Sequence, residues 1–63
     1  PLDYFRFEAG RLCFDDLQTD RVTCMTTDLS PGYHVVDLSA KRHTLRVHYV
    51  ASASGARVIG IER

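Results

Sequence analysis

The sequence predicts an all-β fold, a six-stranded antiparallel meander. Apolar residues alternate with polar ones over six short segments rich in Val, Ile, Thr, Tyr and Phe, as is typical of strands with one buried face. Consecutive segments can also be aligned so that their apolar residues fall opposite each other, and a slip of one residue would destroy this agreement. The expected strands are 3–8, 11–16, 21–27, 33–38, 44–50 and 57–62.

The first two hairpins follow from the residues between the first three strands. Ala9-Gly10 is typical of a tight turn, because Gly10 tolerates the positive φ that such turns require. The second hairpin reverses near Gln18-Thr19. The pairs expected from these two turns are Phe7 with Leu12, Phe5 with Phe14, Leu12 with Met25 and Phe14 with Thr23.

Residues 15–29 also permit a helix. Asp15 or Asp16 could cap its N-terminus, and three apolar residues of the segment follow helical spacing. Four Thr residues and one Val lower the helix propensity, and Pro31 prevents continuation. A strand is therefore the favoured prediction for residues 15–29.

The last three strands are separated by turns of distinct composition. Ser30-Pro31-Gly32-Tyr33 matches a type II turn, and Ala51 to Ala56 is a loop of small residues in which Gly55 can adopt a left-handed conformation. The pairs expected here are Thr27 with Val36, Met25 with Leu38, Leu38 with Leu45, Val36 with Val47, Val47 with Ile61 and Tyr49 with Ile59.

This register gathers the apolar side chains on one face of the meander. The face carries Phe5, Phe7, Leu12, Phe14, Met25, Val36, Leu38, Leu45, Val47, Tyr49, Ile59 and Ile61. The opposite face carries cross-strand charge partners, namely Glu8 with Arg11, Asp16 with Arg21, Asp37 with Arg46 and Arg46 with Glu62. The chain offers no second layer to cover this face. We therefore expect residues 1–63 to form one small domain, either an SH3/OB-like or up-and-down barrel or a face-to-face packed sheet.

Charge and composition indicate an ordinary soluble chain. Eight acidic and eight basic residues give a formal net charge of zero, although residues 1–31 are acidic and residues 32–63 are basic. No apolar run is long enough to span a bilayer and no leader is apparent, so a membrane partner is not expected. A cytoplasmic location is slightly favoured.

Cysteine and histidine residues provide few candidates for chemistry. Cys13 and Cys24 fall opposite each other in the second hairpin, so a cross-strand disulfide is geometrically allowed, while two free thiols are the favoured state. His34, His43 and His48 match no compact zinc pattern, and His34 and His48 are expected on opposite faces. We expect no metal site and no cofactor.

A basic stripe near the fourth turn indicates an alternative role. Lys41, Arg42 and His43 lie in one turn, and Arg46 and His48 extend the stripe along the next strand. Small barrels often bind single-stranded nucleic acid through such stripes, aided by exposed aromatic rings. A nucleic acid or another anionic ligand is therefore an alternative partner, although zero net charge argues against it.

A second alternative depends on the first residue. Pro1, Gly10-Arg11 and Leu45-Arg46-Val47 resemble features of the tautomerase superfamily related to 4-oxalocrotonate tautomerase. The resemblance implies an enzyme in which Pro1 is the general base while Arg11 and Arg46 bind substrate carboxylates. It also implies a long helix between two parallel strands, which differs from the all-β prediction.

The uncovered apolar face, the balanced charge and the lack of a catalytic set favour a non-catalytic role. We expect a binding or assembly module that engages another protein, or a second copy of itself, through the apolar sheet face and the rim beside it. The expected contact residues are Tyr33, His34, Lys41, Arg42, His43, Arg46 and His48. Leu45, Val47, Tyr49, Ile59 and Ile61 would be core or interface.

Overall fold

A computed structural model describes residues 4–16, 20–40 and 43–63, and these residues confirm the all-β prediction. The described residues form strands β1 (Phe5–Glu8), β2 (Arg11–Asp16), β3 (Arg21–Thr26), β4 (Gly32–Ala40), β5 (His43–Ser52) and β6 (Gly55–Glu62). They contain no α-helix, so the helical alternative for residues 15–29 is wrong where that segment is described. Within these ranges, no helical segment has the length and apolarity of a membrane span.

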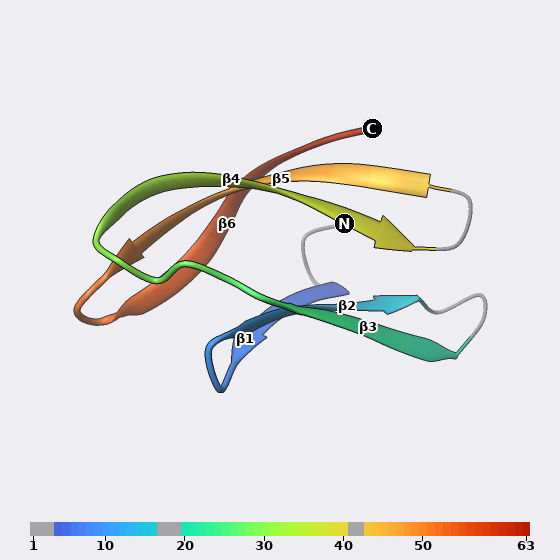
Figure 1. Ribbon diagram of the computed structural model, residues 1–63, viewed down its shortest axis with the longest axis horizontal. Coiled ribbons are helices and arrows are strands. Elements are labelled where there is room, and N and C mark those ends of the chain that lie inside the picture. The colour runs from blue at the N-terminus through green and yellow to red at the C-terminus, as the bar shows by residue number, and fades with distance from the viewer. Residues whose placement is uncertain (1–3, 17–19, 41–42) are drawn as a thin grey trace.

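The strands form two three-stranded antiparallel sheets, ordered β1-β2-β3 and β4-β5-β6. The sheets lie face to face in two layers, with the first sheet below the second in Figure 1. They do not close into a barrel among the described residues. The expectation that the chain lacks a second layer is therefore corrected, because each half of the chain covers the apolar face of the other.

The predicted register is confirmed for three strand pairs, namely β1 with β2, β2 with β3 and β4 with β5. Phe7 lies opposite Leu12 and Leu12 opposite Met25 in the first sheet. Leu38 lies opposite Leu45 in the second sheet. These matches follow from alternation, because a paired apolar residue on the wrong face would leave the core.

The predicted pairing of β3 with β4 is wrong, and with it the pairs of Thr27 with Val36 and of Met25 with Leu38. Residues 27–31 instead cross from one sheet to the other. Their polar groups have partners outside β4: the Thr27 backbone N–H donates to the Gly10 carbonyl at 3.1 Å, and the Ser30 N–H donates to Asp28 Oδ1 at 2.9 Å. Asp28 thus forms a local turn that directs the chain away from a hairpin.

The predicted pair of Tyr49 with Ile59 is also wrong. A β-bulge shifts the register between His48 and Tyr49, so that Tyr49 lies opposite Val58 and His48 opposite Gly60. One extra residue on β6 is thereby left unpaired. Val58 packs against the core, whereas the side chain of Ile59 is 47% exposed.

The core lies between the sheets and draws residues from both. Leu12 and Val47 have no exposed surface, and Tyr49 is 2% exposed. Leu38 and Leu45 complete the buried cluster, and Phe7 contacts Tyr49 with ring centroids 5.2 Å apart. A shell of half-buried side chains packs around the cluster, namely Phe5, Phe7, Phe14, Met25, Val36, Val58 and Ile61.

Cys13 and Cys24 are joined in a disulfide, which corrects the favoured expectation of free thiols. The two residues are directly paired across β2 and β3, with Cα atoms 4.1 Å apart. By alternation from Leu12, Cys13 lies on the outer face of the first sheet, yet it has no exposed surface. Arg6 lies directly opposite Cys13 on β1 and forms ion pairs with Glu8 and Asp15, and Glu8 Oε1 lies 4.0 Å from Cys13 Sγ, so charged side chains adjoin the disulfide on this face.

The disulfide should contribute substantially to stability. Closing a loop of this length in the unfolded chain is expected to stabilise the fold by about 3 kcal/mol. The double variant Cys13→Ala, Cys24→Ala should therefore unfold at lower urea concentration than the oxidised protein. Reductant should lower the unfolding midpoint of the oxidised protein and leave that of the double variant unchanged. Equal unfolding curves for the oxidised protein with and without reductant would contradict this assignment.

The β1–β2 turn should tolerate a stabilising substitution. Ala9 has a φ of 52° and Gly10 a φ of 76°, the combination that type I′ turns require. A left-handed conformation is strained for Ala and less so for Asn. We expect Ala9→Asn to raise the free energy of unfolding by about 0.5 to 1 kcal/mol. Ala53→Asn, in a turn where φ is negative, is the matched control in urea denaturation and should give no gain.

Candidate functional site

The surface of the second sheet that faces away from the core combines apolar, aromatic and charged side chains. Strand alternation and the bulge assign to this outer face the residues Tyr33, Val35, Asp37, Arg46, His48, Val50, Arg57, Ile59 and Glu62. Three of its apolar side chains are exposed: Tyr33 by 58%, Val35 by 45% and Ile59 by 47%. Large apolar side chains that share one sheet face are typical of a contact surface rather than of isolated surface residues.

A chain of side-chain contacts crosses the outer face from β4 to β6. The Tyr33 hydroxyl contacts His48 Nδ1, and His48 Nε2 lies 2.5 Å from Glu62 Oε2. The rings of Tyr33 and His48 are also stacked, with centroids 5.8 Å apart. His48 is placed for this by the register, since Tyr33 and Glu62 occupy the diagonal positions on the two neighbouring strands.

The chemistry of this contact chain favours ordering over catalysis. A neutral imidazole can donate from Nε2 to the carboxylate and accept from the phenol at Nδ1, which satisfies all three groups. An acid–base site would also need a water-excluding pocket with donors for a developing charge. Tyr33 instead lies on an open sheet face, and its hydroxyl is engaged by His48. The contact chain therefore holds two aromatic rings in a fixed arrangement at the surface.

An ion pair lies beside this contact chain. Arg46 Nε donates to Asp37 Oδ1 at 3.1 Å, which confirms the predicted partnership of these two residues. The hydrogen bond with Asp37, followed by the charges of Asp37 and Glu62, raises the pKa of Arg46 above its ordinary value. Because both side chains are more than half exposed, the pair defines the register more than it stabilises the fold.

His34 lies on the opposite face, as predicted, and forms a separate cluster at the edge of the core. Its ring stacks on Tyr49 with centroids 5.1 Å apart, and its Nε2 lies 2.7 Å from the Ser30 carbonyl. The Tyr49 hydroxyl donates to the Asp28 carbonyl at 2.7 Å. Burial, followed by the charge of Asp28, raises the pKa of Tyr49, whereas hydrogen bonds from Ser30 lower the pKa of Asp28. This cluster joins the crossover segment to β5 and is structural in character.

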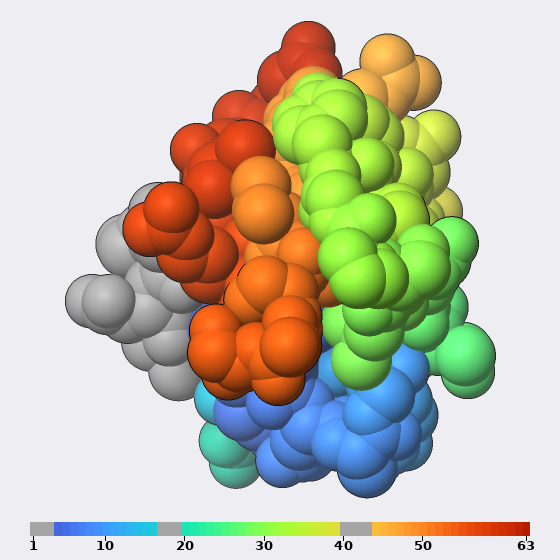
Figure 2. All heavy atoms as spheres, turned by 90° about the vertical axis from the view of Figure 1, so that its left-hand side faces the viewer, coloured from blue at the N-terminus to red at the C-terminus, as the bar shows by residue number. Residues whose placement is uncertain are grey.

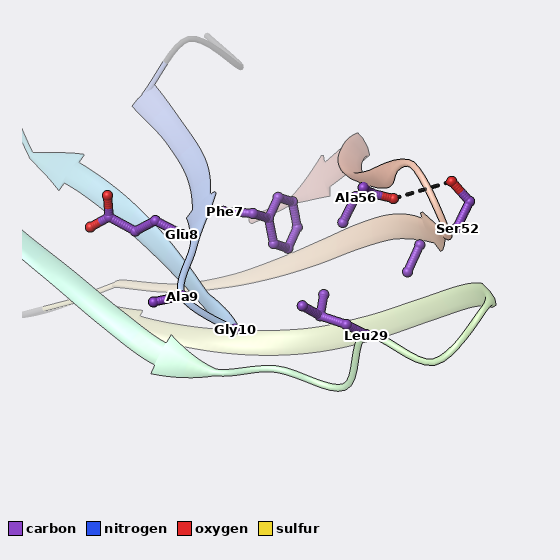
Figure 3. Close-up of a pocket in the computed structure, with 9 residues that line it drawn as sticks. Phe7, Glu8, Ala9, Gly10, Leu29, Ser52 and Ala56 are labelled. Atoms are coloured by element: carbon purple, nitrogen blue, oxygen red, sulfur yellow. Dashed lines mark hydrogen bonds between the residues drawn. The ribbon is translucent and has the colours of Figure 1, made fainter.

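A cavity of about 310 Å³ lies where the two sheets meet at one end of the molecule. The β1–β2 turn and the β5–β6 turn adjoin there, in blue and orange in Figure 2. Phe7 and Leu29 provide apolar lining, while the Glu8 side chain points away from the Phe7 ring (Figure 3). The Ser52 hydroxyl bonds to the Gly55 carbonyl. Ligand sites need polar groups that converge on the ligand, and these side chains do not converge.

The structure brings together only part of the predicted contact set. Tyr33, Arg46 and His48 share the outer face, whereas His34 lies on the inner side. Pro1, Lys41 and Arg42 lie outside the described residues, and His43 begins β5. The two members of the basic stripe whose side chains are described, Arg46 and His48, have carboxylate partners in Asp37 and Glu62.

The fold implied by the tautomerase resemblance is not present in the described part of the chain. All of its strand pairs are antiparallel, and no helix lies between β2 and β5 in the segments described. Arg11 begins β2 in the first sheet and Arg46 lies on β5 in the second, with its guanidinium paired to Asp37. Within the same ranges, no group of three His, Cys, Asp or Glu side chains could hold a metal ion.

Sequence reasoning missed several residues of the outer face. Val35 directly precedes Val36, so alternation already placed it on the face opposite the core. Glu62 was paired with Arg46, and its diagonal contact with His48 follows from the same register. Ile59 had no such signal, because its position depends on the bulge.

Stability should fall at alkaline pH because of Tyr49. Its pKa is raised in the folded state, so above its unfolded pKa of about 10 the folded protein binds more protons than the unfolded chain, and stability falls as pH rises. Tyr49→Phe removes the hydrogen bond to the Asp28 carbonyl, so its free energy of unfolding should be lower by about 1 kcal/mol at neutral pH. That free energy should also decline less steeply as the pH becomes alkaline.

Denaturant unfolding at neutral and alkaline pH measures both effects. Tyr33→Phe serves as the control, because it removes an exposed phenol from the same sheet. It should retain the alkaline decline of the parent protein. A Tyr49→Phe variant with the slope of the parent would show that this phenol is not the group responsible.

Comparisons with known proteins do not point to a relative. No protein-family model, no curated protein and no solved structure matches the chain. Among the described residues, the outer face of the second sheet carries three of the five exposed large apolar side chains, beside the ordered polar groups of Tyr33, His48 and Glu62.

Proposed function

We propose that the chain is a non-catalytic binding module that engages a protein surface through the outer face of the second sheet. The observation that supports this is the exposure of Tyr33, Val35 and Ile59 around the ordered ring of His48. The apolar face to which sequence analysis assigned the binding role forms the core between the sheets. The proposed docking surface is therefore the opposite face of β4, β5 and β6.

Two properties of this face favour a protein partner. Aromatic side chains contribute strongly to protein interfaces, and Tyr33 presents its ring beside aliphatic neighbours. The contacts of Tyr33 with His48 and of His48 with Glu62 hold both rings before a partner arrives. A side chain that is already ordered loses less conformational entropy on binding, so more of the contact energy appears as affinity.

The charges of the face argue against a nucleic-acid partner. Binding to a phosphate backbone requires cations that can replace its counterions. On this face Arg46 is paired with Asp37 and His48 with Glu62, while Arg57 adds one cation at the opposite end. The carboxylates would repel phosphates where the cations could attract them, so a protein surface with its own apolar residues fits better.

Site-specific photo-crosslinking tests the proposal. A photoreactive amino acid at position 59 should form a discrete covalent adduct with a protein, which can be a second copy of the chain, in an extract of the cells that produce it. The matched control is position 22, where Val22 is 55% exposed on β3 of the other sheet. Adducts at position 59 should disappear when Tyr33→Ser is added.

The test requires that each substituted protein is folded. Exposed positions of this kind usually change the free energy of unfolding by no more than about 0.5 kcal/mol, so the substituted proteins should unfold like the parent in urea. Equal labelling at positions 59 and 22, or no adduct at position 59, would contradict a docking role for the outer face.

A further inference from the structure

The outer face of the second sheet has an uneven distribution of charge along its strands. The pairing register arranges it in three rows that cross β4, β5 and β6. One end row is Asp37, Arg46 and Glu62, and the other is Tyr33, Val50 and Arg57. The first therefore carries two carboxylates and one guanidinium, and the second carries one guanidinium.

The middle row is largely apolar. It contains Val35 and Gly60 on either side of His48, with the bulged Ile59 beside Gly60. The end rows are four residues apart along β4 and β5, or about 13 Å, and five residues apart along β6, where the bulge adds one residue. The face is thus a small apolar centre with a net negative charge at one end and a positive charge at the other.

We propose that the partner of this face is a second copy of the chain, a proposal that rests on the function proposed above. A two-fold axis that lies in the interface and follows the middle row places the two end rows against each other. Arg57 of one copy then faces the partner's Glu62, and the same contact recurs by symmetry. A surface that meets its own copy in this way must be self-complementary, and these rows satisfy that requirement.

The same axis brings apolar residues of the middle row together, while Arg46 faces the partner's Val50 and keeps its bond to Asp37. Val35 and Ile59 meet their own copies, which removes their exposed apolar surface from water. Tyr33 faces the partner's Asp37, and each keeps the contact within its own chain, with His48 and with Arg46 respectively. Sheets that pack face to face cross at about 30°, a rotation small enough to keep these rows adjacent over a few residues.

The size of the face sets the strength of the dimer. Three strands of about five residues each cover roughly 15 Å by 15 Å, well below the 800 Å² per partner of a standard interface. The dimer should therefore be reversible and of low affinity, with a dissociation constant of about 100 μM.

Sedimentation equilibrium of the purified full chain, from roughly 10 μM to 1 mM, tests this inference. The mass should rise from monomer to dimer over this range. Arg57→Glu should weaken the dimer at least tenfold, because it sets two carboxylates against each other. Arg11→Glu gives the same change of net charge on an exposed position of the first sheet and should leave dimerisation unchanged.

A charge exchange makes the test specific. Glu62→Arg alone should also weaken association, while an equimolar mixture of Arg57→Glu and Glu62→Arg chains should form heterodimers, since position 57 of each chain then faces an opposite charge at position 62 of the other. Such rescue is expected only if these two positions meet across the interface. Urea unfolding of each variant verifies that it is folded.

The two proposals fail in different ways. A purified chain that stays monomeric at all concentrations would overturn the self-association, while an adduct at position 59 with a different protein would still support the binding module. A dimer insensitive to Arg57→Glu, or one without rescue in the mixture, would also overturn the inference. Loss of both the dimer and the adduct would overturn both proposals.

Discussion

The contact between the two apolar sheet faces is the constraint on which the rest of this structure depends. Leu12 of the first sheet and Val47 of the second have no exposed surface, and neither could be covered by its own sheet alone. A three-stranded sheet without a second layer leaves its apolar face exposed to water. The two halves of the chain therefore stabilise each other, and the inward side chains determine which residues are left on the outer faces.

Much of this arrangement could be predicted from the alternation of apolar and polar residues, because alternation depends only on residues that are close together in the sequence. Within each hairpin the turn residues fix the pivot, and a single register keeps Leu12, Leu45 and their partners on the buried face. The same reasoning placed Cys13 opposite Cys24, although their joining depends on redox chemistry as well as on geometry. Tyr33 was a contact candidate because of its place at the rim, and His48 because it extends the basic stripe along its strand.

The separation into two sheets could not be predicted from alternation. A period of two indicates which residues share a face, but it does not decide whether consecutive strands pair. That decision depends on contacts between distant residues, such as the bond from Thr27 to the Gly10 carbonyl and the bond from Tyr49 to the Asp28 carbonyl. These contacts turn residues 27–31 into a crossover, and they become visible only once both sheets are in place.

The bulge links the fit of the core to the character of the outer face. With continuous pairing, Ile59 would lie opposite Tyr49 in the core, as alternation predicts. The bulge sets Val58 there instead and leaves Ile59 exposed on the other side, beside His48. One change of register thus adds an apolar side chain to the surface that already holds Tyr33 and Val35.

The outer faces of the two sheets consequently differ. On the first sheet, Arg6 and its two carboxylate partners share the outer face with the disulfide, and Cys13 has no exposed surface. On the second sheet, the charged pair of Arg46 and Asp37 lies at one end, and the apolar centre beside it is left exposed. In the described part of the chain, the outer face of the first sheet exposes one large apolar side chain, Val22, whereas that of the second sheet exposes three, so the second sheet is where binding would gain most from the removal of water.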